Sequence, residues 1–331
     1  MKEMTTEELL KEIEENHNNS LFEEIFKRRD KELYRTALFY KGTKINYLTL
    51  KYNVIRYAKA LKAYGIKKGD EIPICMANTP EFIYLLGGIS LIGAKANIFG
   101  EGFDKDYITE IINGCNSDIL FATDDKYSVI DDSVKNSKNK KVVLISLTGS
   151  LLNGKNPYIN LEKKWYDFKD RRNEIKDNSS RFMFSSEFLN LGKEYKGNYI
   201  EKVNLDDEFT ITYSSGSTNS SRPKAIVHDV KSYIVMGIYH DPKISKVPSM
   251  KNLRMLAHIP THSNTNIMSC ITDPLMQGSE IAVEPIYTPD HFVYSLLINK
   301  PSFVTATRSF FVRCANDILN NKKFKNVKMP F

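Results

Sequence analysis

Residues 209–228 read FTITYSSGSTNSSRPKAIVH and form the most informative segment of this chain. Two β-like runs, Phe209–Tyr213 and Ala225–His228, flank a segment of mostly small or turn-forming residues. Such a segment directs many backbone N–H groups and several hydroxyls toward one point, and Lys224 adds a positive charge at its far end. We therefore expect two strands joined by a phosphate-binding loop. On composition alone, a solvent-exposed linker is an equal alternative.

The order of these residues is more specific than their composition. The usual P-loop is excluded, because Gly-Lys-Ser/Thr is missing and a strand follows the loop instead of a helix. Tyr213–Thr218 followed by Arg222–His228 resembles the phosphate-loop signature of the AMP-forming adenylating enzymes, which include acyl-CoA synthetases, amino-acid adenylation domains and luciferases. The resemblance implies that the phosphates of ATP bind to Ser214, Ser215, Gly216, Ser217, Thr218 and Lys224, with Thr218 as a contact for Mg²⁺.

The loop departs from the family pattern in two ways. Residues 219–222 separate Thr218 from Pro223, whereas the family usually has two residues there. Asn219 and Ala225 stand where the family has glycine, and Asn tolerates a left-handed backbone better than most residues. We therefore expect the family's kind of loop, longer by two residues.

Motifs outside the loop carry the resemblance further. Each is weak alone, and they gain weight because their order and spacing agree with the family from about residue 37 to residue 320. They are the strand-to-helix entry Ile45–Leu50, the run Gly65–Ile72, the helix start Asn78–Phe82 and the turn Gly93-Ala94.

Strand-like and helix-like segments alternate along the first part of the chain. We expect strands at 37–40, 45–47, 71–76, 94–99, 118–122 and 141–147, and helices at about 5–29, after a Thr49 cap, from Pro80 after a Thr79 cap, and at 105–113. This alternation predicts an open, mainly parallel α/β fold. We expect two such units, 1–200 and an incomplete 201–331, with a polar excursion at 148–200 that carries the single tryptophan, Trp165.

The candidate substrate pocket follows the loop. Leu256–His262 resembles the strand that ends in Pro-x-x-His in acyl- and aryl-CoA ligases, with one residue fewer before the histidine. The resemblance places His262 and Asn264 in the pocket, and a hydrogen-bonded packing role for His262 is the alternative. Amino-acid-adenylating domains carry an Asp near this strand, whereas Ile259–Ile267 contains no acidic residue. Because a buried, unpaired ammonium is costly, we expect the substrate to be a plain carboxylic acid.

Several parts of the family pattern are missing from the sequence. It contains no Tyr-Gly-x-Thr-Glu, no ribose-binding Asp motif and no C-terminal domain with its lysine. We therefore expect a truncated chain, an incomplete reading frame or half of a split enzyme whose separate partner chain supplies the C-terminal part. The resemblance implies a small-molecule carboxylic acid, ATP and CoA as substrates, with Mg²⁺. It leaves the catalytic residues unknown, and we expect no turnover by this chain alone.

Three classes of function remain open. The first is the N-terminal part of an AMP-forming carboxylate–CoA ligase. The second is a non-catalytic relic or regulatory module that binds a nucleotide or phosphate. The third is an amino-acid or acyl-carrier-protein adenylating domain.

Composition excludes other classes. The chain has 331 residues and a net charge of +7, but basic residues are mixed with acidic ones, which argues against a nucleic-acid partner. No window approaches the roughly 18 consecutive apolar residues of a transmembrane helix. Residues 1–20 lack an apolar signal core, so we expect a cytoplasmic protein. The four cysteines are far apart, which indicates reduced thiols, and the histidine spacings fit no metal-ligand motif.

Overall fold

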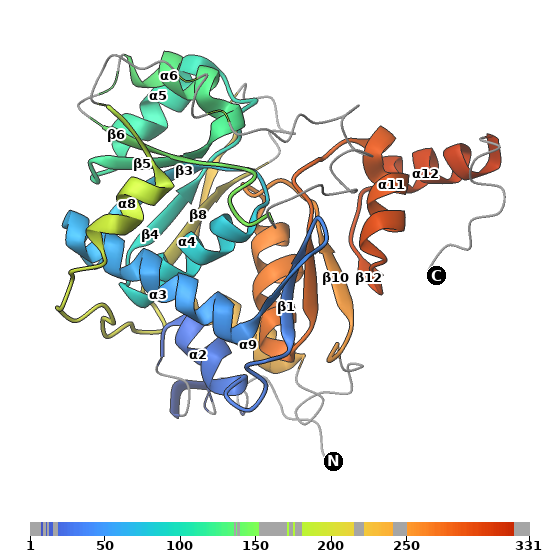
Figure 1. Cartoon of the computed structure of the whole chain (residues 1–331), viewed down its shortest axis with the longest axis horizontal. Coiled ribbons are helices and arrows are strands. Elements are labelled where there is room, and N and C mark those ends of the chain that lie inside the picture. Colours follow the sequence, from blue (N-terminus) through green and yellow to red (C-terminus); the bar gives the residue numbers. More distant parts are fainter. Residues whose placement is uncertain are drawn as a thin grey trace.

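The computed structural model describes residues 19–135, 137, 140–151, 171, 175, 181–214, 222–240 and 250–320, together with 8, 11 and 13–15. Its strands form two sheets, and helices lie between the sheets and on their outer faces (Figure 1). Both sheets are mainly parallel. The expected α/β fold class is therefore confirmed.

The first sheet has seven strands, and all neighbours are parallel except β8 and β9, which are antiparallel. The segment 209–228 therefore contains two paired strands, as predicted. In spatial order the strands are β7 (Phe182–Phe184), β6 (Lys141–Ile145), β5 (Ile119–Thr123), β3 (Glu71–Cys75), β4 (Lys95–Ile98), β8 (Glu208–Tyr213) and β9 (Ala225–Asp229).

The second sheet has five strands and takes them from both ends of the chain. β1 pairs with β11 in parallel and with β2 in antiparallel orientation. The spatial order is β12 (Phe303–Val304), β10 (Arg254–Ala257), β11 (Glu280–Val283), β1 (Thr36–Tyr40) and β2 (Thr43–Asn46).

The division of the chain differs from the expected boundary at residue 200. β8 and β9 follow that boundary and belong to the first sheet, whereas β1 and β2 precede it and belong to the second. β8 pairs with β4 and β1 pairs with β11, although the two strands of each pair are far apart in the sequence. A strand joins the sheet edge that offers it hydrogen-bond partners, whatever its position along the chain. The expected boundary therefore does not separate the two sheets.

The helix α4 (Pro80–Leu91) forms the centre of the largest apolar cluster, and every one of its residues is buried. That cluster joins side chains of both sheets with those of α2 (Leu21–Arg28), α3 (Tyr47–Tyr64), α8 (Ser185–Leu191), α9 (Val230–Tyr239), the π-helix η2 (Asn266–Thr272) and α10 (Asp273–Gln277). The core therefore continues from one sheet to the other, and its close packing fixes the position of one sheet relative to the other.

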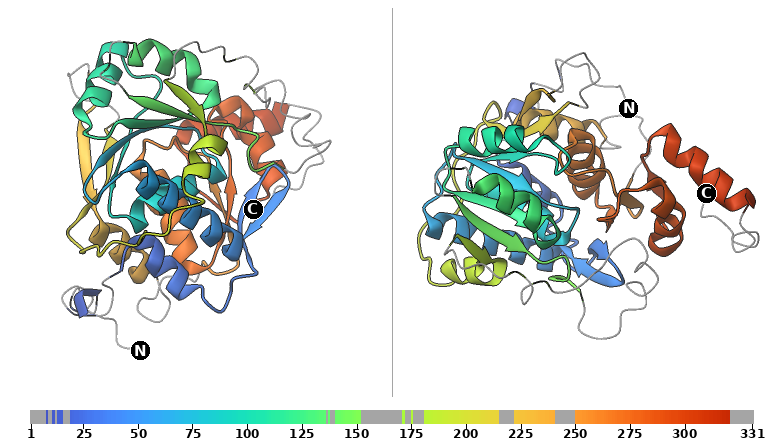
Figure 2. Two further views of the ribbon diagram at one scale, coloured as in Figure 1. Left: turned by 60° about the vertical axis from the view of Figure 1, so that its left-hand side comes forward. Right: turned by 90° about the horizontal axis from the view of Figure 1, so that it is seen from above.

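Two smaller clusters cover the outer faces. α5 (Lys105–Gly114) and α6 (Tyr127–Val134), which follows the short helix η1 (Asp124–Lys126), pack on β5 and β6. α11 (Pro289–Asn299) and α12 (Arg308–Asn320) pack on the second sheet. Figure 2 shows α12 projecting away from the rest of the chain.

Two helix starts test the expected caps. Thr79 caps α4 by accepting a hydrogen bond from the Phe82 N–H, and Pro80 is the first helical residue, as predicted. The cap of α3 is Asn46 and not Thr49, because the Asn46 side chain accepts the hydrogen bond from the Thr49 N–H. Asn is an equally good cap, so α3 begins three residues earlier in the sequence.

The expected polar excursion at 148–200 contains the regular elements β7 and α8 in its described part, and Trp165 lies outside the described residues. All four cysteines are buried and free, as expected. Among the described helices, none is both long and apolar enough to span a membrane.

Candidate functional site

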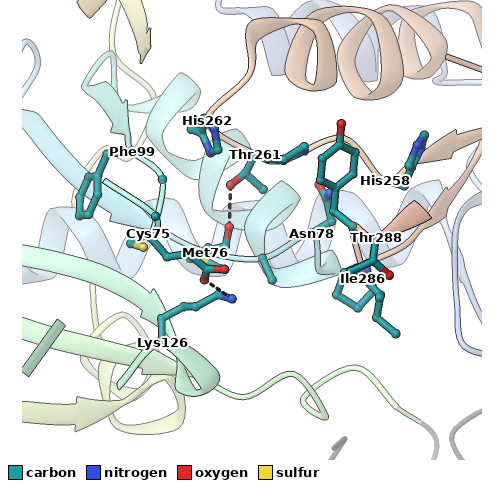
Figure 3. Close-up of a pocket in the computed structure, with 17 residues that line it drawn as sticks. Cys75, Met76, Asn78, Phe99, Lys126, His258, Thr261, His262, Ile286 and Thr288 are labelled. Carbon is teal, nitrogen blue, oxygen red and sulfur yellow. Dashed lines mark hydrogen bonds and ion pairs between the residues drawn. The ribbon is translucent and has the colours of Figure 1, made fainter. Parts of the chain in front are cut away.

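A cavity of about 410 Å³ lies where the carboxyl ends of strands from both sheets meet (Figure 3). β3 and β4 contribute the residues that follow them from the first sheet, and β10 and β11 do the same from the second. In open α/β sheets, ligands bind in crevices outside the carboxyl ends of parallel strands. The cavity has the position that this rule predicts. Its lining is Cys75–Asn78, Phe99–Gly102, Lys126, His258, Pro260–His262 and Pro285–Thr288.

A buried network of hydrogen bonds joins the two sheets beside this cavity. The Thr261 hydroxyl donates to the Met76 carbonyl at 2.6 Å, and the Asn78 amide donates to the Ile259 carbonyl at 2.7 Å. Asn266 in η2 donates to the Asn78 side chain at 2.8 Å. Two of these residues, Asn78 and Thr261, also line the cavity, so the network that joins the sheets also shapes it.

His262, which we expected in the substrate pocket, is one of the residues that line this cavity. Burial lowers the pKa of its imidazole, so the ring is neutral at pH 7. The ring packs edge-on against Phe103, with the centroids 5.6 Å apart, and Phe103 packs in the same way against Tyr213 at the end of β8. The Tyr213 N–H also donates to the His262 carbonyl at 3.4 Å. His262 therefore connects the cavity to the strand that leads into the loop.

Asn264, the other residue expected in the substrate pocket, makes its contacts away from this cavity. Its side-chain oxygen accepts a hydrogen bond from the Tyr233 hydroxyl at 2.6 Å, and it is not among the cavity-lining residues. The Tyr233 hydroxyl also lies 2.6 Å from the Thr210 hydroxyl on β8. Asn264 therefore helps to join the segment that follows β10 to α9 and, through Tyr233, to β8.

The two ends of the phosphate-loop segment are held together. The Ser214 N–H donates to the Lys224 carbonyl, and the Lys224 N–H donates to the Ser214 hydroxyl, each at 2.9 Å. The Tyr107 hydroxyl anchors the same place by donating to the Pro223 carbonyl at 2.7 Å. Lys224 itself is exposed. The four other implied phosphate-binding residues, Ser215, Gly216, Ser217 and Thr218, lie outside the described residues.

A charged cluster lines the cavity on the side of the first sheet, and sequence reasoning did not identify it. Lys126 forms ion pairs with Glu101 and with Asp125, the latter at 2.8 Å. Burial acts to lower the pKa of Lys126, but the two carboxylates outweigh it and raise this pKa. Lys126 and Glu101 follow β5 and β4, so charged residues just after buried strands were the available signal.

His258, the first residue after β10, is the second histidine of the cavity and is 1 % exposed. Burial lowers its pKa to about 4. His228, on β9, lies with its Nε2 3.0 Å from the Thr212 hydroxyl on the neighbouring strand β8. Within the described part of the chain, no three His, Cys, Asp or Glu side chains form a group that could hold a metal ion.

Comparisons with known proteins agree with this arrangement. The family model described as AMP-binding enzyme matches residues 26–329. The 3-hydroxypropionyl-coenzyme A synthetase of Sulfurisphaera tokodaii is 30 % identical over 209 residues, which are 61 % of this chain and 29 % of that protein. The acetyl-coenzyme A synthetase of Methylocella silvestris is 27 % identical over 218 residues, which are 61 % of this chain and 30 % of that protein. The match thus spans under a third of each relative.

Solved structures show the same fold. The anthranilate CoA ligase AuaEII, in complex with anthranoyl-AMP, superposes with a TM-score of 0.73 and 14 % identity over 93 % of this chain and 53 % of its own. The coronafacic acid ligase of Pectobacterium brasiliense gives a TM-score of 0.69 with 18 % identity, over 93 % of this chain and 53 % of its own. Because the family model matches most of the length of this chain, the chain belongs to the AMP-binding enzyme family.

Proposed function

We propose that this chain supplies the carboxylate pocket and the phosphate loop of an ATP-dependent, AMP-forming carboxylate–CoA ligase. In that reaction a carboxylate oxygen attacks the α-phosphorus of ATP and pyrophosphate leaves; the thiol of CoA then displaces AMP from the acyl adenylate. The observation that carries the proposal is the junction between cavity and loop, where the Tyr213 N–H donates to the His262 carbonyl. The relatives named as acetyl- and 3-hydroxypropionyl-coenzyme A synthetases support a small carboxylic acid as the substrate.

The residues at the ends of the loop fit a polyphosphate. Ser214 and Lys224 are held side by side by two hydrogen bonds, which brings the strand ends of the segment together. The Lys224 ammonium has no ion-pair partner within the described ranges, and its exposure leaves it accessible to an anion. A charge-assisted contact to phosphate is about twice as strong as a neutral hydrogen bond. The proposed contact for Mg²⁺, Thr218, lies outside the described residues.

The cavity favours a plain carboxylic acid over an amino acid. Glu101 is the one acidic residue among those that line it, and its carboxylate already pairs with Lys126. The lysine offsets the negative charge of Glu101 and makes it a weaker partner for a substrate ammonium, and an incompletely paired buried charge is costly. The tertiary structure thus adds an acid that the run 259–267 lacks, together with a cation that offsets it.

Binding and turnover measurements on the 331-residue chain test this proposal. Isothermal titration should detect the binding of ATP. It should also show that acetate or propionate binds more tightly than glycine or alanine. Carboxylate-dependent exchange of pyrophosphate into ATP should be absent, because positioning groups act as a unit and the sequence lacks several of them. If ATP or phosphate binds but none of the carboxylic acids binds, the result would contradict the proposal and favour a phosphate-binding module. Measurable exchange would show that this chain is sufficient for adenylation.

A further inference from the structure

The ring of His258 lies at the end of the cavity that the second sheet forms. Figure 3 shows it at one end of the labelled residues, with Lys126 on the other side of the cavity and Thr261 between them. Tyr287, Phe292 and Phe310 surround the ring, with centroids 5.8, 5.3 and 5.6 Å away. An aromatic enclosure of this kind suits an apolar side chain, yet the sequence places a histidine in it.

The polar atoms of His258 are poorly satisfied by the described part of the protein. Neither ring nitrogen has a partner at normal hydrogen-bond geometry among the described residues. A hydrogen-bonding interaction with the Leu256 backbone and the charge of Glu284 act to raise the pKa of the ring, but burial dominates and keeps the ring neutral. A neutral imidazole carries one N–H donor and one acceptor nitrogen. Buried polar groups are nearly always hydrogen-bonded, so an unsatisfied pair at a cavity wall points to a ligand.

The neighbouring Glu284 cannot serve as the missing partner. Its carboxylate is occupied by Lys41 at 2.7 and 2.8 Å, by Ser295 and Asn299 at 3.2 Å, and by the Ile286 N–H at 3.0 Å. These contacts hold the segment 285–288 in place as the wall beside His258.

The two cavity histidines have different surroundings. His262 lies beside the strand that leads into the phosphate loop, so the reacting carboxylate belongs at its end of the cavity. His258 follows β10 and lies among the aromatic rings of the second sheet, so the tail of the acid belongs at its end.

From this geometry, and resting on the proposed function, we propose that His258 is a specificity residue that hydrogen-bonds a hydroxyl group on the tail of the carboxylic acid. The preferred substrates are then hydroxy acids and not the hydrocarbon acids of the same size. A site built to hydrogen-bond a hydroxyl discriminates strongly against an analogue that lacks it, because the analogue leaves the buried polar atoms of the site unpaired.

Matched pairs of acids test this inference. 3-Hydroxypropionate and butyrate form the first pair, in which a terminal hydroxyl replaces a methyl group of nearly the same size. Two longer pairs make the same comparison: 4-hydroxybutyrate with pentanoate, and 5-hydroxypentanoate with hexanoate. Isothermal titration of the full chain, with ATP present, should show at least one hydroxy acid binding about tenfold or more tightly than its partner. His258→Phe, which suits the aromatic surroundings, should make the members of each pair bind equally, whereas His258→Asn should retain part of the preference.

The outcomes separate the two proposals. Equal binding within every pair by the unsubstituted chain would overturn the role of His258 and leave the proposed function intact. A hydroxyl preference that persists in His258→Phe would also overturn it, because another group would then read the hydroxyl. If no carboxylic acid binds at all, the proposed function fails and this inference fails with it. Circular dichroism of His258→Phe shows that a lost preference is not lost folding.

Discussion

The side-chain nitrogen of Lys41 lies 2.7 Å from a carboxylate oxygen of Glu284, and both side chains are fully buried. Lys41 follows β1 and Glu284 follows β11, so the pair joins the ends of two neighbouring parallel strands. Ser295 and Asn299 of α11 each place a donor 3.2 Å from the same carboxylate. Burial acts to raise the pKa of Glu284, but Lys41 holds it below its usual range. The Glu284 carboxylate is therefore held in its ionised form, and loss of its partner should alter the adjoining segment 285–288.

Lys41→Met should lower the free energy of unfolding by about 3–5 kcal/mol, because it leaves a buried carboxylate without its counter-charge. The double variant Lys41→Met/Glu284→Met should recover much of that loss, since it removes both charges. Chemical denaturation of the two single variants and the double variant measures the coupling. Strictly additive losses would show that the two groups do not depend on each other.

Thr261→Val should cost about 1–3 kcal/mol, because it keeps the shape of the side chain and leaves the buried Met76 carbonyl without its hydrogen bond. Thr265→Val is the matched control: Thr265 is exposed, four residues further along the same segment, and should change stability by less than about 0.5 kcal/mol. Thermal or urea unfolding measures both. If the two variants behave alike, the bond between Thr261 and Met76 does not stabilise the junction of the sheets.

Glu81, at the start of α4, should make stability depend on pH. Burial raises its pKa to about 7, one oxygen accepts a hydrogen bond from Ser150 at 2.6 Å, and the other has no partner among the described residues. The folded state therefore keeps the proton up to about pH 7, whereas the unfolded chain releases it near pH 4.5. This carboxyl lowers the free energy of unfolding as the pH rises between those values, by about 3 kcal/mol at most.

Glu81→Gln removes the titrating group and keeps an acceptor oxygen for Ser150. We expect the variant to be more stable than the unsubstituted chain at pH 8, with little difference at pH 4, where both states of the natural carboxyl are protonated. Denaturation curves recorded at intervals from pH 4 to pH 8 measure this. A constant difference between the two proteins across the range would mean that Glu81 does not titrate there.

Lys224→Ala should weaken ATP binding by about tenfold, because it removes a charge-assisted contact to phosphate. Ser220→Ala is the comparison: Ser220 lies in the two-residue extension of the loop, outside the described residues, and should have a smaller effect. Isothermal titration with ATP, and with inorganic triphosphate as the simpler probe, measures both. Equal and nearly unchanged affinities would remove the phosphate-loop assignment.

Local patterns in the sequence predicted the elements well. The order of small residues around Gly216 with Lys224 indicated the family, and the turn and strand signals gave β8 and β9 close to their observed bounds. The Thr79-Pro80 start of α4 was also readable, because a cap and its helix are neighbours in the chain. The cap of α3 was placed wrongly, because Asn46 and Thr49 are both good caps and only the backbone direction distinguishes them.

Apolar periodicity, caps and turn residues act over a few neighbouring positions, so they predict which segments become strands and helices. The order of residues 213–228 also indicated two strands joined by a segment that resembles a phosphate loop. Which sheet each strand joins, and which side chains meet, became clear from the three-dimensional arrangement. His258, Glu101 and Lys126 come from three different strand ends and share one cavity, whereas Asn264, two residues from His262, does not reach it. The reason is physical: contacts across a sheet edge depend on strand order and packing, which neighbouring residues do not encode.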